Sequence, residues 1–117
     1  MSWFQVFLRQ EARAYRQGEV IFERGAPANC MYVVADGEVD LAIGDQHLET
    51  LRTADIFGEL AVITCEPRSG TARARTDCRL VEIPESRFIY LVQETPNFAL
   101  EVMRVLTRRL RRRDPAE

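Results

Sequence analysis

The segment 57–74 places an acidic side chain and a guanidinium nine residues apart around a short apolar turn. Arg68 can bind two phosphate oxygens at once through its planar guanidinium. Ser69 beside it adds a hydroxyl donor. Glu59 would repel a phosphate, so we expect its carboxylate to accept hydrogen bonds from hydroxyl groups, such as those of a ribose. Together these residues indicate a site for a sugar phosphate of modest negative charge.

Main-chain groups of the same segment suit an anion as well. Gly58 can adopt a positive φ or let a ligand approach the backbone closely. The apolar run 60–63 is long enough for about one helical turn, and the first N–H groups of such a turn, near Leu60 and Ala61, have no partner inside it. Each residue alone also has an ordinary interpretation as a solvated loop charge or a turn residue. Their spacing by itself therefore defines only a generic anion site.

The residues around this segment show a pattern typical of a β protein. Short β-prone runs separated by glycines extend from Tyr15 to Ile83. In one of them, Val39, Leu41 and Ile43 alternate with polar residues, the period-two pattern of a half-buried strand. Several short strands with regular turns predict an antiparallel β-roll of the jelly-roll type over residues 14–83.

Helices are expected at both ends of the roll. Apolar residues in 2–10 have helical spacing, and Pro84 is well placed to begin a helix on which Phe88, Leu91 and Val92 share a face. Thr95-Pro96 should end it, and a second helix should follow within residues 84–113. We expect that second helix to carry Ala99, Val102, Met103, Leu106 and Leu110 on one face, with Arg104, Arg108, Arg111 and Arg112 on the opposite face.

Composition excludes several classes of protein. The chain has 117 residues, a formal net charge of −2 and 46% hydrophobic residues, which is typical of one globular domain spanning 1–117. A charge this small favours neither nucleic acid nor an acidic membrane surface. No apolar run approaches the roughly 20 residues of a transmembrane helix, and the N-terminus lacks the pattern of a signal peptide. We therefore expect a cytoplasmic protein that does not contact the membrane.

The sequence offers no set of metal ligands or catalytic groups. Cys30, Cys65 and Cys78 form no CxxC pair, which argues for reduced thiols rather than a disulfide or zinc site. His47 is the only histidine, whereas metal sites in barrels of cupin type use several. No GxSxG or other catalytic motif is present. We expect no metal, no cofactor and no catalytic residue, and so no enzyme.

The motif itself resembles a known family. Residues 57–61 (FGELA) followed by 67–69 (PRS) resemble the phosphate-binding cassette of cyclic nucleotide-binding domains. Further segments resemble the opening strands of that family (18–22, 31–34 and 36–39) and its last strand before the hinge helix (80–84). The similarity covers about residues 14–110. It implies a non-catalytic sensor of a cyclic nucleotide that couples ligand capture to movement of its C-terminal helices.

The resemblance also implies roles for individual residues. Glu59 would accept a hydrogen bond from the ribose 2′-hydroxyl, and Arg68 would bind the exocyclic phosphate oxygens. Main-chain N–H groups near Leu60 and Ala61, together with Ser69, would complete the phosphate site after Gly58. The expected ligand is cAMP, while the hydroxyl of Ser69 leaves cGMP open.

Some features depart from the family. Gly70 stands where many members have Ala, which would loosen the strand after the phosphate site. The sequence ends soon after Leu110, without the long dimerisation helix and helix-turn-helix domain of the transcription-factor relatives. What reads out ligand binding is therefore left open.

Two other interpretations remain. A β-roll of this kind could serve as an interaction or oligomerisation module without nucleotide, forming a homodimer or binding an effector protein through the stripe on its last helix. The arginine run 108–113 could contact nucleic acid, but no recognition helix follows it, so we expect weak, salt-sensitive binding and no sequence specificity.

Overall fold

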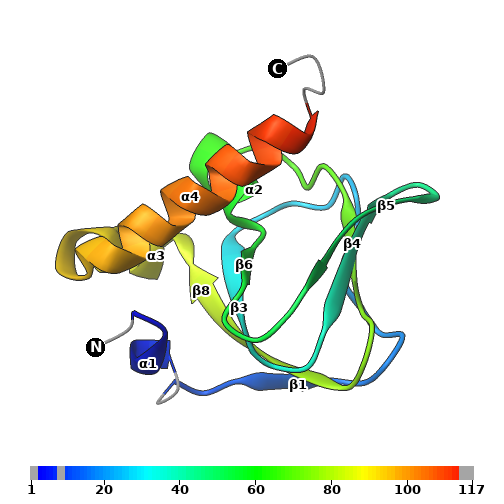
Figure 1. Cartoon of the computed structure of the whole chain (residues 1–117), viewed down its shortest axis with the longest axis horizontal. Coiled ribbons are helices and arrows are strands. Elements are labelled where there is room, and N and C mark those ends of the chain that lie inside the picture. The colour runs from blue at the N-terminus through cyan, green and yellow to red at the C-terminus, as the bar shows by residue number, and fades with distance from the viewer. Residues whose placement is uncertain (1–2, 8–9, 114–117) are drawn as a thin grey trace.

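The computed structural model describes residues 3–7 and 10–113 (Figure 1). Its elements follow the order helix, roll, helices that the sequence predicts, and the helical turn expected over 60–63 is a short helix inside the roll. They are α1 (Phe4–Phe7), β1 (Arg13–Tyr15), β2 (Val20–Phe22), β3 (Cys30–Asp36), β4 (Val39–Ile43), β5 (Gln46–Leu51), β6 (Ile56–Phe57), α2 (Glu59–Thr64), β7 (Thr71–Ala74), β8 (Cys78–Pro84), α3 (Glu85–Glu94) and α4 (Pro96–Arg113).

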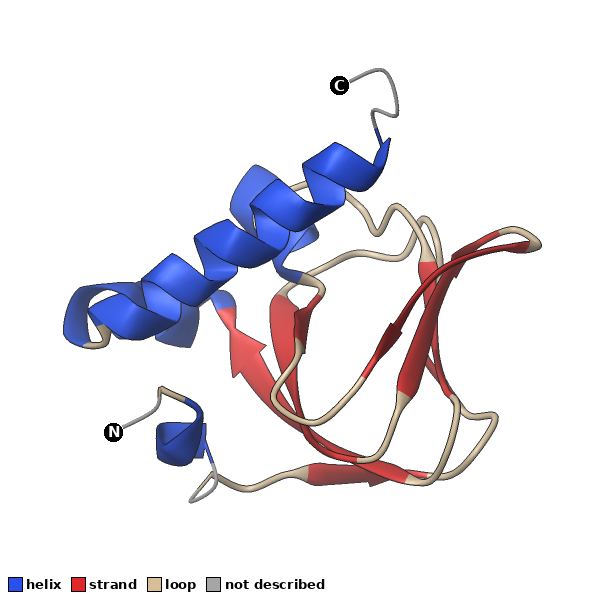
Figure 2. Ribbon diagram, viewed as in Figure 1, coloured by secondary structure: helices blue, strands red, loops and turns tan. Residues whose placement is uncertain are grey.

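The strands form two four-stranded antiparallel sheets, in the orders β1-β8-β3-β6 and β2-β7-β4-β5 (Figure 2). Neighbours in each sheet come from distant parts of the chain: Met31 in β3 pairs with Ile83 in β8, and Asp40 in β4 pairs with Arg73 in β7. Such pairing wraps the chain into a roll, and the predicted fold class is confirmed.

Strand β3 separates two hydrophobic cores. Successive side chains of a strand point to opposite faces. Met31 and Val33 therefore pack into a core beneath the helices, whereas Tyr32 and Val34 pack inside the roll. All four are buried, which explains why this strand reads as a continuous apolar run rather than as an alternating one.

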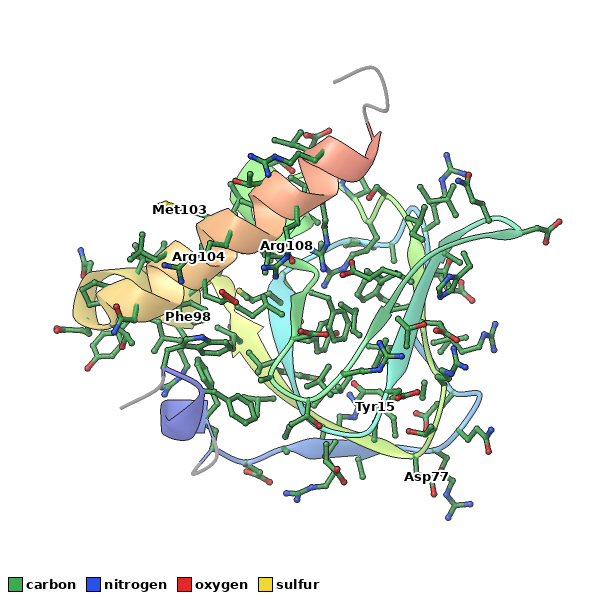
Figure 3. The ribbon with its side chains drawn as sticks, in the orientation of Figure 1. Tyr15, Asp77, Phe98, Met103, Arg104 and Arg108 are labelled. Atoms are coloured by element: carbon green, nitrogen blue, oxygen red, sulfur yellow. The ribbon has the colours of Figure 1, made fainter. Side chains whose placement is uncertain are left out.

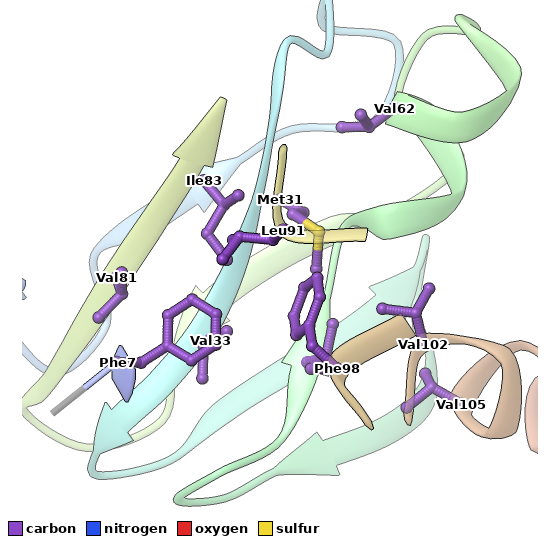
Figure 4. Close-up of a cluster of buried hydrophobic side chains, with 11 residues drawn as sticks. Phe7, Met31, Val33, Val62, Val81, Ile83, Leu91, Phe98, Val102 and Val105 are labelled. Carbon is purple, nitrogen blue, oxygen red and sulfur yellow. The ribbon is translucent and has the colours of Figure 1, made fainter. Parts of the chain in front are cut away.

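The helices at both ends of the chain cover the outer face of the β3–β8 sheet. Phe7 of α1, Leu91 of α3 and Phe98 of α4 meet β-strand residues in one buried cluster (Figure 4). The expected N-terminal helix over 2–10 is described as α1 alone, and residues 8–9 lie outside the described part. α4 runs obliquely from this cluster toward α2 (Figure 1).

The apolar faces predicted for α3 and α4 need correction. Val92 is 40% exposed and does not share the buried face of Leu91. On α4, Val102 is buried but Met103 is 58% exposed, so the predicted stripe divides between two sides of the helix. Its buried side is formed by Phe98, Val102 and Val105, while Met103 lies on the outer side (Figure 3).

No helix in the described part of the chain is both long enough and apolar enough to cross a membrane.

Candidate functional site

A cavity of about 670 Å³ lies between the β4–β5 hairpin, α2 and the C-terminal half of α4. Five of the six predicted site residues, Gly58, Leu60, Ala61, Arg68 and Ser69, line it. Glu59 does not: it is fully buried behind the wall, between the lining residues Gly58 and Leu60 in the chain. The other residues of its wall come mainly from the hairpin and from α4: Phe22, Leu41, Ala42, Ile43, Gln46, His47, Leu48, Glu49, Gly70 and Arg109.

Gly58 and Arg68 meet directly at the floor of this cavity. Gly58 precedes α2 with φ 78°, a left-handed conformation that favours glycine. A Cβ atom added to it would lie 2.8 Å from Nη1 of Arg68. Arg68 Nη1 also donates to the Gly58 carbonyl at 2.9 Å. The missing side chain is therefore what lets the guanidinium approach the backbone.

Arg68 is buried without an anionic partner. Its side chain is 5% exposed, Nη2 donates to the Cys30 carbonyl at 2.6 Å, and its guanidinium carbon lies 4.1 Å from the centre of the Phe22 ring. Among the described residues, no carboxylate forms an ion pair with it. Its Nε atom is buried and has no hydrogen-bond partner. A desolvated cation of this kind would be stabilised by an anion.

Tyr32 contributes a second aromatic ring beside Arg68, 5.8 Å from the guanidinium carbon. Burial, followed by the hydrogen bond with Cys30, raises the pKa of Tyr32 above its usual range. The phenol therefore stays neutral, and it supplies a polarisable wall for the cation rather than a counter-charge.

Glu59 is the first residue of α2 and is fully buried. Its Oε1 accepts a hydrogen bond from Nη1 of Arg109, which belongs to α4. Its Oε2 is buried and has no hydrogen-bond partner. Glu59 Oε2 and Arg68 Nε, one acceptor and one donor, are the two buried side-chain atoms without partners in the described part of the chain.

Arg109 is a site residue that the sequence analysis did not identify. Besides Glu59, it binds Glu49 Oε2 through Nε at 3.2 Å and the Ile56 carbonyl through Nη2 at 3.0 Å. The sequence contained a signal for it: Arg109 lies seven residues after Val102 and four after Val105, on their buried face of the helix.

The remaining predicted residues lie around the mouth of the cavity. Leu60 is 38% exposed, Ala61 is buried in the first turn of α2, and Ser69 is exposed. Gly70 has a structural reason to lack a side chain, because a Cβ there would lie 2.8 Å from the Ala42 carbonyl oxygen. The glycine thus permits close packing against β4, which corrects the expectation that it loosens the strand.

His47 lies at the mouth of the cavity and has only local partners. Its Nε2 is 3.0 Å from Thr50 Oγ1 and 3.2 Å from Asp40 Oδ1, and the residue is exposed. Within the described residues, no group of three His, Cys, Asp or Glu side chains could hold a metal ion.

The geometry defines a β-roll whose cassette buries one acid and one arginine beside a cavity, and comparison with known proteins assigns this arrangement to a family. A family model described as the cyclic nucleotide-binding domain matches residues 12–95. The chain belongs to the cyclic nucleotide-binding domain family, as its sequence resemblance implied.

Relatives of several kinds share this domain. A putative potassium channel protein of Rhodopseudomonas palustris is 32% identical over 99 residues, covering 82% of this chain and 24% of its own length. The crystal structure of Thermus thermophilus catabolite activator protein superposes with a TM-score of 0.82 at 29% identity, over 96% of this chain and 55% of that one.

A third neighbour is an EAL enzyme solved in cAMP-bound and cGMP-bound forms. The cAMP-bound form has 30% identity and a TM-score of 0.67 over 86% of this chain and 28% of that one. The cGMP-bound form has 29% identity and a TM-score of 0.69 over 91% of this chain and 30% of that one. The chain thus spans about a quarter to a half of the length of these proteins.

Proposed function

We propose that this chain is a non-catalytic sensor that binds one cyclic nucleotide, with cAMP as the expected ligand, in the cavity beside α2. The observation that carries the proposal is the pair of buried atoms without partners, Glu59 Oε2 and Arg68 Nε. A buried polar atom without a partner is costly, and few occur in a folded protein. Arg68 lines the cavity, and Glu59 lies between two residues that line it, Gly58 and Leu60. One acceptor and one donor so placed fit a ligand that presents both a hydroxyl and an anionic oxygen.

Arg68 is the residue that binds the phosphate. A cyclic phosphate diester carries one negative charge, which matches the single guanidinium buried here. Arg68 now donates to the carbonyls of Gly58 and Cys30, both of which are neutral acceptors. An exocyclic phosphate oxygen would accept a stronger, charge-assisted hydrogen bond. Ser69 and the main-chain N–H groups of Leu60 and Ala61 complete the phosphate site.

Glu59 binds the sugar, and its free oxygen accepts the ribose 2′-hydroxyl. The base then lies along the apolar part of the cavity wall. Leu41, Ile43 and Leu48 supply that surface from the β4–β5 hairpin. These side chains contact a purine without selecting adenine over guanine, so base preference depends on polar groups nearby.

Binding is coupled to α4 in this proposal. The helix reaches the cavity through Arg109, so a ligand that changes the cassette also changes the docking of the helix. Such a shift requires a ligand to bind one arrangement more tightly than the other, typically by about 1–3 kcal/mol. The regulatory relatives use the same domain in longer proteins, and the α4 shift is the signal that this chain would pass on.

Isothermal titration calorimetry with cAMP and with cGMP tests the proposal. We expect one nucleotide to bind per chain, and we expect the Arg68→Ala variant to lose that binding. Arg79→Ala is the matched control, because Arg79 is exposed on β8 and does not line the cavity. Folded protein that gives no heat with either nucleotide at high micromolar concentration would disprove the proposed function.

A second candidate function is an interaction module that uses the outer face of α4. Leu100, Met103 and Leu110 are 45%, 58% and 68% exposed, with spacings of three and seven residues that place them along one side of the helix. A second copy of the chain could pack against this side as a homodimer. Light scattering would show a dimer that the Met103→Glu variant converts to a monomer; a monomer at all concentrations would exclude this function.

A further inference from the structure

Arg109 connects the last helix to Glu59, a fully buried acid at the start of α2. Its guanidinium divides its donors among Glu59 Oε1, Glu49 Oε2 and the Ile56 carbonyl. Its side chain is only 18% exposed, although it belongs to a run of arginines at the end of a helix. These contacts, which we call the Arg109 clasp, join α4 to β5, to β6 and to the start of α2.

The clasp determines which oxygen of Glu59 is available. A carboxylate can rotate about its last torsion and exchange its two oxygens. Arg109 binds Oε1 through Nη1, and its other donors, bound to Glu49 and the Ile56 carbonyl, hold the guanidinium in place, so the carboxylate is kept in one orientation. Oε2 then remains buried and without a partner, in a residue whose chain neighbours Gly58 and Leu60 line the cavity. Without Arg109, Glu59 would lose the hydrogen bond that fixes its carboxylate, which could then exchange its two oxygens or turn away.

We propose that Arg109 is a positioning residue for ribose recognition: it fixes the orientation of Glu59 and so directs Oε2 to the 2′-hydroxyl of the ligand. The proposal rests on the proposed function, since it concerns the same site. It assigns to α4 a part in selecting ribose over deoxyribose. It also gives the ligand a direct route to the helix, because the hydroxyl and Arg109 bind the two oxygens of one carboxylate.

The direction of the coupling follows from this shared carboxylate. A hydroxyl that donates to Oε2 stabilises Glu59 in one orientation, and that orientation is the one that Arg109 binds. Ligand and helix therefore reinforce each other, and linkage requires the effect to be reciprocal. We expect ligand binding to tighten the docking of the C-terminal turns of α4 rather than to release it.

The test compares cAMP with 2′-deoxy-cAMP, which lacks only the hydroxyl in question. Calorimetry on the unaltered chain should give a preference for cAMP of about tenfold or more, the value of a hydrogen bond to a charged acceptor. In Arg109→Ala this preference should fall below about threefold, because Glu59 no longer presents Oε2. The ratio of two affinities is insensitive to a uniform loss of folded protein.

Two further variants make the result specific. Arg108→Ala is the matched control, since Arg108 is the exposed neighbour on the same helix (Figure 3), and it should keep the full preference. Arg109→Lys keeps the positive charge and should retain part of the preference for cAMP over 2′-deoxy-cAMP. This variant provides the test if Arg109→Ala is too unstable to measure. Hydrogen exchange should show that cAMP protects the end of α4 in the unaltered chain but not in Arg109→Ala.

Different results would overturn the role of Arg109 and the proposed function. If the unaltered chain binds neither nucleotide, the proposed function is wrong and this inference falls with it. If the chain binds cAMP but the preference for the 2′-hydroxyl is the same in Arg109→Ala or Arg109→Lys as in the unaltered chain, only the role of Arg109 is overturned. Equal affinity of the unaltered chain for cAMP and 2′-deoxy-cAMP would also overturn it.

Discussion

At the scale of single residues, the candidate site consists of two charged side chains that the fold buries with incomplete sets of partners. Arg68 has two carbonyl acceptors and no carboxylate, and Glu59 has one guanidinium and a free oxygen. Burial of this kind costs stability, and an anionic, hydroxyl-bearing ligand would offset that cost on binding.

Substitution of the two charged residues should have unequal effects. Arg68→Ala removes the counter-charge of a desolvated phosphate, and we expect affinity for cAMP to fall more than about 100-fold. Glu59→Gln keeps an oxygen that can accept the ribose hydroxyl, so we expect a loss nearer to tenfold. Calorimetry on both variants checks this order. A larger loss for Glu59→Gln would mean that the sugar, not the phosphate, anchors the ligand.

Gly58 should be intolerant of any side chain. Gly58→Ala introduces a Cβ 2.8 Å from Arg68 Nη1 at a positive φ, so it should displace the guanidinium and lower cAMP affinity by more than about tenfold. Gly18→Ala is the control: its φ is also positive, at 87°, but nothing lies within 4 Å of the added Cβ. Both should lose about 1–2 kcal/mol of stability from backbone strain. Equal affinities in the two variants would contradict the close approach described here.

The sequence predicted most of the cassette but not its connection to the helix. Gly58, Glu59, Arg68 and Ser69 were identified because a motif within one short segment carries its own spacing. Arg109 was not, because it is one of five arginines between positions 108 and 113 and only tertiary packing determines which of them turns inward. The helical phase set by Val102 and Val105 contained that information.

At the level of strands and helices, a hydrophobic pattern depends on whether one or both sides of the element are buried. The alternation in β4 predicted a strand correctly, but its faces differ less than expected: Val39 is buried, whereas the other four residues of the strand are all half-buried. Strand β3 lies between two cores, so its pattern is continuous. The buried face of α4 was predicted incorrectly. Apolar residues occur on both the inner and the outer side of this helix, and the sequence alone does not show which side is buried.

The inner side of α4 should therefore be far more sensitive to truncation than the outer side. Phe98 is fully buried and meets the rings of Phe7 and Trp3, so Phe98→Ala should cost about 3–5 kcal/mol of unfolding free energy. Leu100→Ala, two residues later and 45% exposed, should change stability by less than about 1 kcal/mol in the monomer. Urea unfolding of both variants is the measurement, and similar losses would contradict the packing of α4.

At the scale of the whole molecule, stability should depend on pH in the alkaline range. Cys78 and Tyr15 are weak acids in the core inside the roll. Burial, with smaller contributions from acidic neighbours, raises the pKa of Cys78 from 9.0 to about 11. Burial, then the charge of Glu82, raises the pKa of Tyr15 from 10.0 to about 12. Both groups thus hold their protons in the folded state after the unfolded chain has lost them.

The sign of the effect follows from this difference in proton binding. Below pH 9 both states keep the Cys78 proton, and stability is unaffected. Between pH 9 and 11 only the folded state keeps it, so unfolding becomes more favourable by at most about 1.4 kcal/mol per pH unit. Tyr15 adds a similar term above pH 10. Denaturant unfolding from pH 7 to 11 should show the decline.

Substitution of the buried thiol should reduce that decline. Cys78→Ala removes one titrating group, so the slope between pH 9 and 10 should be smaller than in the unaltered chain. Cys65→Ala is the control, because Cys65 is exposed and its replacement should leave the slope unchanged. A pH dependence that is identical in Cys78→Ala would show that this thiol does not link protons to folding.

The most direct test of the whole account is a crystal structure of the chain grown with cAMP. The account predicts that a phosphate oxygen accepts a hydrogen bond from Arg68 and that the ribose 2′-hydroxyl donates to Glu59 Oε2, with Arg109 still bound to the same carboxylate. A nucleotide bound elsewhere, or one that leaves Arg68 Nε and Glu59 Oε2 without partners in the occupied cavity, would contradict it.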